Sequence, residues 1–252
     1  MTNCRVTVSG IAAAALLGCA ALGTASPAVA SETRAVLELF TSQGCDSCPP
    51  ADKLLSELAK DPAIIALTVA VDYWDYLGWK DTLALAGHGN RQRAYARVRG
   101  DRDVFTPQVI VSGSAQALGS DKAQVERAIA QSRRLPTTLS MPLSLTVNDR
   151  KLLVNAPEGK SGAERAEVWL CPITKAAPVE ITRGENKGRS ITYHNVVRRW
   201  IKLGEWNGTA ASWTVPLSDF QTDAIDQVAV VVQSGTAAAP GAMLAAAMIP
   251  LR

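Results

Sequence analysis

The residues of this chain best suited to chemistry are two cysteines, Cys45 and Cys48, with two residues between them. They follow an apolar run at residues 36–40 that is typical of a buried strand, and they precede residues 51–60, whose leucines recur at helical spacing. The dithiol therefore stands at the start of a predicted helix, where unpaired N–H groups and the helix dipole favour negative charge. A thiolate at such a place has a lowered pKa, and the thiolate is the reactive form of cysteine. The spacing predicts a redox site.

Other interpretations of the dithiol are a closed structural disulfide, half of a zinc site, or two buried apolar side chains. Zinc needs four ligands, and the only histidines, His88 and His194, are remote in sequence. A disulfide across so small a loop restrains little unfolded-state entropy, so it stabilises poorly. We therefore predict redox chemistry or binding of a soft metal, with no resident cofactor or metal.

Asp46 lies between the two cysteines and bears on the strength of the predicted thiolate. Its negative charge opposes a thiolate at Cys45 and offsets part of the helix dipole. We therefore expect only a modest depression of the Cys45 pKa, which argues against an extreme oxidant.

Thr106 and Pro107 begin another predicted strand, residues 104–111. A proline that begins a strand beside a dithiol can follow a cis peptide bond, and cis bonds are almost confined to proline. Such a bond would present the Thr106 backbone to an extended substrate and keep a metal-binding side chain away from the sulfurs. The alternative is an ordinary trans proline at a strand start.

Asp72, Trp74 and Asp75 follow a nearly continuous apolar run at residues 64–71, which predicts a strand buried on both faces. Ligands of parallel sheets bind beyond the carboxyl ends of the strands, so these residues are predicted to flank the dithiol. One of the carboxylates could relay the proton of Cys48. A solvated loop with a core tryptophan is the other interpretation.

The first 30 residues have the pattern of a signal peptide. Arg5 precedes an apolar run at residues 11–22, and the small residues 28–30 suit cleavage by a signal peptidase. The run is too short to span a bilayer comfortably, which takes about 20 residues. We expect a periplasmic or secreted protein with no transmembrane helix in the mature chain; lipidation at Cys19 is the alternative.

The charge and the cysteine content limit the classes of binding partner to expect. The chain has 26 basic and 23 acidic residues and a net charge of +3, which argues against nucleic acid as a partner. Only Cys45, Cys48 and Cys171 follow the predicted signal peptide, too few for a disulfide framework. The expected partners are protein or small-molecule thiols and disulfides, together with an unknown redox partner.

Residues 31–135 alternate strand-like and helix-like runs in the order of an α/β thioredoxin-like domain with a helical insertion. Pro136 and Pro142 flank a linker-like stretch, and short β-like runs separated by turns follow it. We therefore predict a signal peptide (1–30), a thioredoxin-like domain (31–135) and a smaller antiparallel β-sandwich-like domain (136–252).

Other polar and aromatic residues have less specific interpretations. Glu38 interrupts an apolar strand and is either a buried acid or an edge residue that points to solvent. The arginines of the helix-like run that ends near Arg99, including Arg91, are predicted to form its wet face. Core packing explains the tryptophans of the second half better than a carbohydrate platform does. These are Trp169, Trp200, Trp206 and Trp213.

Several motifs of the first half are similar to those of one protein family. They lie at residues 36–52, 71–81, 91–95 and 106–108. With them the chain resembles the exported bacterial domain-of-unknown-function family 1223 over most of residues 35–250. The resemblance implies a thioredoxin-like fold with an attached β-rich domain, and it places Cys45 and Cys48 at the redox site without implying a substrate. Members often carry a histidine before the segment at Asp72, whereas this chain has Ala70 and Val71 there, so no imidazole is expected at that point.

We therefore expect an exported thiol–disulfide oxidoreductase, in which Cys45 attacks a substrate disulfide and Cys48 resolves the mixed disulfide. One alternative is a thioredoxin-like carrier that holds Cu(I) without turnover, because soft thiolates select Cu(I). Pro107 and the lack of a nearby histidine argue against it. A non-catalytic binding module is the other alternative.

Overall fold

The computed structural model describes residues 33–159 and 165–251. Its helices within these ranges are α1 (Pro49–Leu58), α2 (Ala86–Arg99) and α3 (Lys122–Ser132), with short 3-10 turns η1 (Asp75–Leu77) and η2 (Leu217–Asp219). The strands are β1 (Ala35–Thr41), β2 (Ile64–Ala70), β3 (Gln108–Val111), β4 (Ala115–Leu118), β5 (Ser144–Asn148), β6 (Lys151–Ala156), β7 (Ala166–Glu180), β8 (Ser190–Val197), β9 (Ile201–Trp206), β10 (Ala211–Pro216), β11 (Gln227–Thr236) and β12 (Ala239–Pro250).

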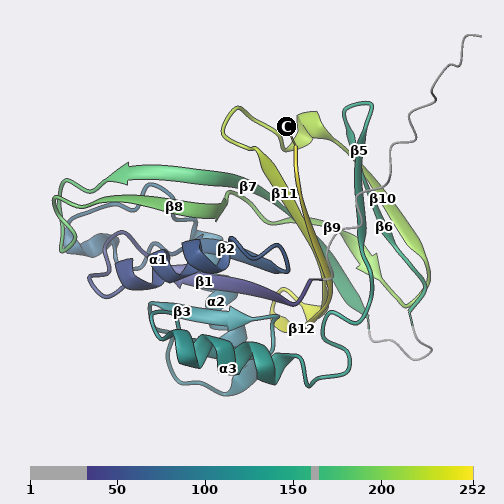
Figure 1. Ribbon diagram of the computed structural model, residues 1–252, viewed down its shortest axis with the longest axis horizontal. Coiled ribbons are helices and arrows are strands. Elements are labelled where there is room, and N and C mark those ends of the chain that lie inside the picture. Colours follow the sequence, from purple (N-terminus) through teal and green to yellow (C-terminus); the bar gives the residue numbers. More distant parts are fainter. Residues whose placement is uncertain (1–32, 160–164, 252) are drawn as a thin grey trace, which may run out of the picture. The chain divides into compact units, whose positions relative to one another are not determined.

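Most of the strands belong to one mixed sheet of nine strands (Figure 1). Its order is β12-β11-β7-β8-β2-β1-β3-β4, and β9 pairs with β7 beside this path. β2 runs parallel to β1 and to β8, whereas the other neighbours are antiparallel. The strands β10-β6-β5 form a second, antiparallel sheet that packs on β7, β11 and β12.

The predicted fold class is wrong. The structure is mostly β, with 42% strand and 19% helix, and one large mixed sheet takes in strands from both halves of the chain. β8 joins β2 at the pair Thr68 and Val196, and the Thr68 hydroxyl donates to the carbonyl of His194 at 2.6 Å. Strand-like runs after residue 136 therefore complete the sheet begun by the first half instead of forming a smaller antiparallel β-sandwich-like domain, and a thioredoxin-like domain with a helical insertion does not describe the whole.

Alternation along β1 sends its side chains to two different cores. Leu37 and Leu39 pack with residues of α1 and α3. Val36 and Phe40 face the other way, toward Tyr95 of α2 and toward residues of β7, β11 and β12. β1 is therefore buried along its whole length, and it leads directly into the turn that carries the dithiol.

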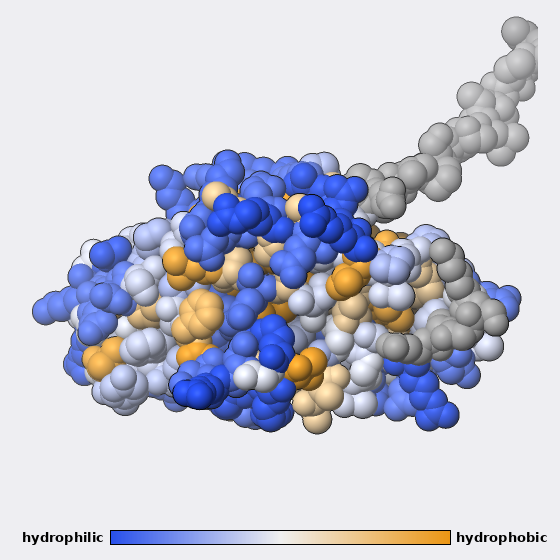
Figure 2. Space-filling model, turned by 90° about the horizontal axis from the view of Figure 1, so that it is seen from below, coloured by the Kyte–Doolittle hydropathy of each residue, from blue (hydrophilic) through white to orange (hydrophobic). Residues whose placement is uncertain are grey.

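α3 illustrates how the sequence pattern sets burial. Asp121 begins the helix as predicted, because its carboxylate accepts a hydrogen bond from the Gln124 N–H at 3.0 Å. Val125 and Ile129 are buried against the sheet, and the charged residues face solvent. Figure 2 looks from the side on which α3 lies and shows a largely hydrophilic surface with scattered hydrophobic residues, which is ordinary for a protein surface.

A buried ion pair ties β1 to α2. Arg91 donates to both carboxylate oxygens of Glu38, at 2.5 and 3.2 Å, and the Glu38 side chain is fully buried. The hydroxyl of Tyr95 donates to Glu38 at 2.6 Å, and Arg91 also donates to Gln233 of β11 at 2.8 Å. Glu38 is thus the buried acid of the two interpretations, and Arg91 does not belong to a wet helix face.

Replacing Glu38 with glutamine should strongly destabilise the protein, because Arg91 would remain buried without a countercharge. Removal of one partner of a buried pair costs roughly 3–5 kcal/mol. Urea unfolding should measure this loss in the free energy of unfolding. Glu205→Gln, which removes one partner from the exposed Lys202–Glu205 pair, is the control and should change little. Equal effects of the two substitutions would contradict the assignment.

Candidate redox site

Cys45 and Cys48 form a disulfide at the start of α1, with their Cα atoms 5.4 Å apart. Cys48 occupies the N-cap position, and prolines fill the first turn, where a missing N–H costs little. Cys45 closes the preceding turn by donating its N–H to the Ser42 carbonyl at 3.2 Å. The cysteines therefore lie between strand and helix as the sequence predicted, at a helix end that no side chain caps.

The disulfide is almost completely covered. Cys45 is 2% exposed and Cys48 is 0% exposed, whereas Asp46 and Ser47 between them face solvent. The Sγ of Cys45 lies 3.4 Å from the Ser47 hydroxyl. Only the tip of the turn, including the exposed Asp46, is therefore open to a partner in this oxidised state.

Trp74 spans two sides of the site. The indole Nε1 donates to the Thr106 hydroxyl at 2.8 Å, and a Cβ built on Gly44 would lie only 3.2 Å from the Trp74 Cβ. Tyr76, which is 76% exposed, stacks on the outer side of the site against Trp74, with ring centroids 6.3 Å apart. The structure thus brings together Trp74 and Thr106, two of the residues named from the sequence, beside the turn that ends in Cys45.

Pro107 follows a cis peptide bond from Thr106, as the sequence predicted. Gly119 lies between Pro107 and Ala51 in the first turn of α1. A Cβ at Gly119 would lie 3.2 Å from that of Ala51 and 3.3 Å from that of Pro107. The absence of a side chain at 119 lets the ends of β3 and β4 approach the helix that carries the dithiol.

The dithiol turn is held from both halves of the chain. The backbone N–H of Gln43 donates to the Asp81 carboxylate at 2.7 Å. Asn186, from the connection between β7 and β8, donates to the carbonyls of Gln43 and Cys45 at 3.0 and 2.7 Å. These bonds satisfy polar groups that would otherwise be buried without partners. Sequence reasoning missed Asn186, because no local pattern links it to the cysteines.

Asp72 and Asp75 were predicted as candidate proton relays near Cys48. The carboxylate of Asp75 instead accepts a hydrogen bond from the Asp81 N–H at 3.0 Å, and the backbone of Asp72 accepts one from Asp75 at 3.1 Å. Both therefore help to shape the segment that carries Trp74. Their relay role stays a prediction.

Asp52 is a site residue that sequence reasoning missed. It is 5% exposed, accepts a hydrogen bond from the Thr41 hydroxyl at 2.8 Å, and donates its own N–H to the Cys48 carbonyl at 3.1 Å. Residues four apart share a helix face, so Asp52 lies on the side of α1 below Cys48. The available signal was its position three residues before Leu55, on the apolar stripe of the helix.

The surroundings of Asp52 raise its pKa close to neutrality. Burial raises the pKa of Asp52 to about 7; the Thr41 hydroxyl lowers this pKa, and the negative charge of Asp81 raises it. Burial also raises the pKa of Tyr193 in β8, and the nearby carboxylates of Asp52 and Asp81 raise it further. Neither Asp52 Oδ2 nor the Tyr193 hydroxyl has a hydrogen-bond partner among the described residues.

Among the described residues, neither histidine side chain makes a hydrogen bond to the dithiol. His88 lies on α2, and its Nδ1 is 2.8 Å from the carbonyl oxygen of Ala70 at the end of β2. Within residues 33–159 and 165–251 there is no group of three or more histidine, cysteine or acidic side chains that could hold a metal. In these two ranges, none of the helices is both long enough and apolar enough to cross a membrane.

Comparison with known proteins adds a family to this geometry. No curated protein matches the chain. A crystal structure of a protein from Agrobacterium tumefaciens is 29% identical, with a TM-score of 0.77, and the match covers 86% of this chain and 94% of that one. Residues 36–233 match the model of the family described as "Protein of unknown function (DUF1223)". Since that match extends over most of its length, the chain belongs to the DUF1223 family.

Proposed function

We propose that the protein is a thiol–disulfide oxidoreductase that acts through Cys45 and Cys48. The observation that carries this proposal is the Cys45–Cys48 disulfide at an uncapped helix start with the buried carboxyl of Asp52 four residues behind it. The helix end stabilises a thiolate, and a carboxyl with a pKa of about 7 can exchange protons at physiological pH.

The reaction is an exchange of disulfides in two displacements. A substrate thiolate attacks the Cys45 sulfur, the Cys45–Cys48 bond breaks, and Cys48 leaves as a thiolate and takes a proton. A second substrate thiolate then attacks the substrate sulfur of the mixed disulfide, and Cys45 leaves as a thiolate. Two substrate thiols thereby become a disulfide, and the protein pair gains the two electrons. The reverse sequence reduces a substrate disulfide.

Asp52 supplies or accepts the proton of Cys48 in this scheme. Cys48 is fully buried, so bulk water does not reach its sulfur. A buried thiolate without a proton donor is costly. Asp52 is the buried carboxyl on the same helix face, and its pKa of about 7 lets it give or take a proton near neutral pH when the disulfide opens.

In this proposal Trp74, beside the turn that ends in Cys45, limits access to the Cys45 sulfur. The sulfur is almost fully covered, and Trp74 is held by Gly44 on one side and Thr106 on the other. Displacing the indole breaks one hydrogen bond, which contributes about 1 kcal/mol. The exposed Tyr76, stacked on Trp74, offers a partner an apolar surface at the same place.

In this proposal the protein works in an oxidising compartment outside the cytoplasm. The signal-peptide pattern lies at residues 1–30, outside the described residues, and export to the periplasm or secretion stays a prediction from it. Dithiols of exported proteins exchange with an oxidising environment.

Cys45→Ser should abolish catalysed insulin reduction, because it removes the attacking sulfur. Cys48→Ser should accumulate a mixed disulfide with the substrate, since the resolving thiol is lost. Mass spectrometry of acid-quenched reactions measures both. Cys171→Ser is the matched control and should leave turnover unchanged, because Cys171 is fully buried and burial raises its pKa. Turnover that survives in Cys45→Ser would refute the proposed nucleophile.

Asp52→Asn should change how stability depends on pH. The folded pKa of Asp52, about 7, lies above its ordinary value of 3.8, so the folded state binds this proton more tightly than the unfolded state. The unfolding free energy of the oxidised wild type should therefore fall as pH rises from about 4 to about 7 and then level off, by up to about 4 kcal/mol.

The Asp52→Asn variant lacks this loss, so the two proteins should differ little at pH 4, and the variant should be the more stable one at pH 8. Guanidinium unfolding at a series of pH values provides the measurement. In the reduced state, the rate at which Cys48 resolves a mixed disulfide should lose a titration near pH 7. Parallel stability profiles for the two proteins would show that Asp52 titrates normally.

Trp74→Phe should speed reduction of the disulfide by dithiothreitol. The ring stays, but its hydrogen bond to Thr106 is lost, and a contribution of about 1 kcal/mol corresponds to a rate increase of about fivefold. Stopped-flow or quenched reduction kinetics report the rate. Trp213→Phe in β10, on the second sheet, is the control. An unchanged rate in Trp74→Phe would show that the indole does not limit access.

A further inference from the structure

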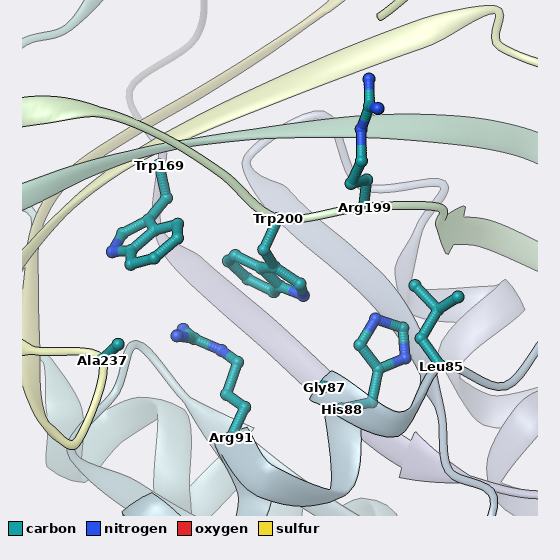
Figure 3. A pocket seen from close by; sticks show the side chains of 8 residues that line it. All are labelled: Leu85, Gly87, His88, Arg91, Trp169, Arg199, Trp200 and Ala237. Carbon is teal, nitrogen blue, oxygen red and sulfur yellow. The ribbon is translucent and has the colours of Figure 1, made fainter.

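A pocket of about 320 Å³ opens beside α2, and neither cysteine of the dithiol is among the residues that line it. This volume lies at the lower end of the range for small-molecule sites. Its wall is formed by Trp169 of β7, Trp200 between β8 and β9, and the start of α2 (Figure 3). Leu85 and Ala237 add apolar surface on two sides.

The aromatic wall of the pocket is held in place from below. Figure 3 shows the Arg91 guanidinium near the two indole rings, and its central carbon lies 3.9 Å from the Trp200 ring centroid. The rings of Trp169 and Trp200 meet edge to face, with centroids 6.5 Å apart. Because Arg91 is itself fixed by Glu38, the pocket presents a preformed aromatic surface.

Two buried polar atoms of the pocket lack partners. His88 is fully buried, and neither its Nε2 nor the Nε1 of Trp200 makes a hydrogen bond to any described residue. Figure 3 shows the two nitrogens on the edges of their rings that face each other. His88 Nδ1 lies 2.8 Å from the Ala70 carbonyl, which can only accept, so Nδ1 carries the hydrogen and Nε2 is an acceptor. Burial lowers the pKa of His88 to about 4, which keeps the ring neutral.

The start of α2 gives the pocket an anion-binding end. The N-cap is Leu85, which cannot cap with its side chain, and the first turn has no acidic residue. The His88 N–H already donates to the Leu85 carbonyl at 2.9 Å. The N–H groups of Ala86 and Gly87 before it have no acceptor within the helix, and the helix dipole makes this end positive. Gly87 lines the pocket and is exposed, so the backbone there is open to a ligand.

We propose that this pocket binds a small aromatic α-hydroxycarboxylate. The carboxylate lies at the start of α2, where the N–H groups receive it. The neighbouring hydroxyl donates to His88 Nε2 and accepts from Trp200 Nε1, since a hydroxyl serves both roles. The aromatic ring packs on Trp169 and Ala237, at the end of the pocket away from the start of α2.

Isothermal titration calorimetry with three related compounds tests this assignment. Phenyllactate carries all three groups, hydrocinnamate lacks the hydroxyl, and phenyllactate methyl ester lacks the negative charge. Phenyllactate should bind saturably, and each of the other two should bind at least about tenfold more weakly, because each leaves hydrogen-bonding groups of the pocket unmatched. Absence of saturable phenyllactate binding, or equal affinity for the ester, would overturn the proposal.

Substitutions in the lining locate the binding. Trp200→Phe keeps a ring over Arg91 but removes the Nε1 donor, so phenyllactate affinity should fall by about fivefold to tenfold. Ala237→Glu places a negative charge on an exposed loop of the lining and should weaken binding by at least about tenfold, whereas Ala238→Glu, exposed but outside the lining, should not. Equal loss in both glutamate variants, or no loss in Trp200→Phe, would refute the site. Binding by Cys45→Ser should match wild type, which separates this proposal from the redox function.

Discussion

The buried pair of Glu38 and Arg91 is the interaction on which the surrounding structure depends. It joins the middle of β1 to α2, and through Gln233 it reaches β11, which the chain adds almost two hundred residues later. A buried charge must be matched wherever it lies. The pair therefore fixes α2 against the sheet, and it holds Trp200 by the stacked guanidinium. α2 has few apolar residues, so hydrophobic burial alone would hold it only weakly against the sheet.

The need to pair buried polar groups also shapes the turn that carries the dithiol. Asp81 and Asn186 supply the hydrogen bonds that the backbone of this turn cannot make within a helix or strand. Only Asp52 enters the apolar side of α1, and there burial keeps its pKa near neutrality. The carboxylate of Asp81 accepts several backbone hydrogen bonds. Asp52 accepts one from Thr41, and its other oxygen has no hydrogen-bond partner among the described residues.

Local patterns predicted the elements well and their assembly poorly. The apolar run before Cys45, the prolines after Cys48 and the cap at Asp121 gave the strand and helices that the structure shows, because each depends on neighbouring residues. The sheet order depends on pairing across the chain, such as Thr68 with Val196, which leaves no trace in local periodicity. Arg91 was misjudged for the same reason, since its countercharge lies 53 residues earlier. Asp52 was visible in principle as a carboxylate on an apolar stripe.

The two candidate sites share one edge of the sheet. Thr41 and Ala70 are paired at the ends of the parallel strands β1 and β2. Thr41 holds Asp52 behind the dithiol, whereas the carbonyl of Ala70 orients His88 in the aromatic pocket. Loops that leave the carboxyl ends of parallel strands diverge to opposite faces, which opens space for ligands there. One rigid strand pair therefore positions the buried carboxyl of Asp52 on the α1 side and the acceptor nitrogen of His88 on the α2 side, and both positions are set by the same register.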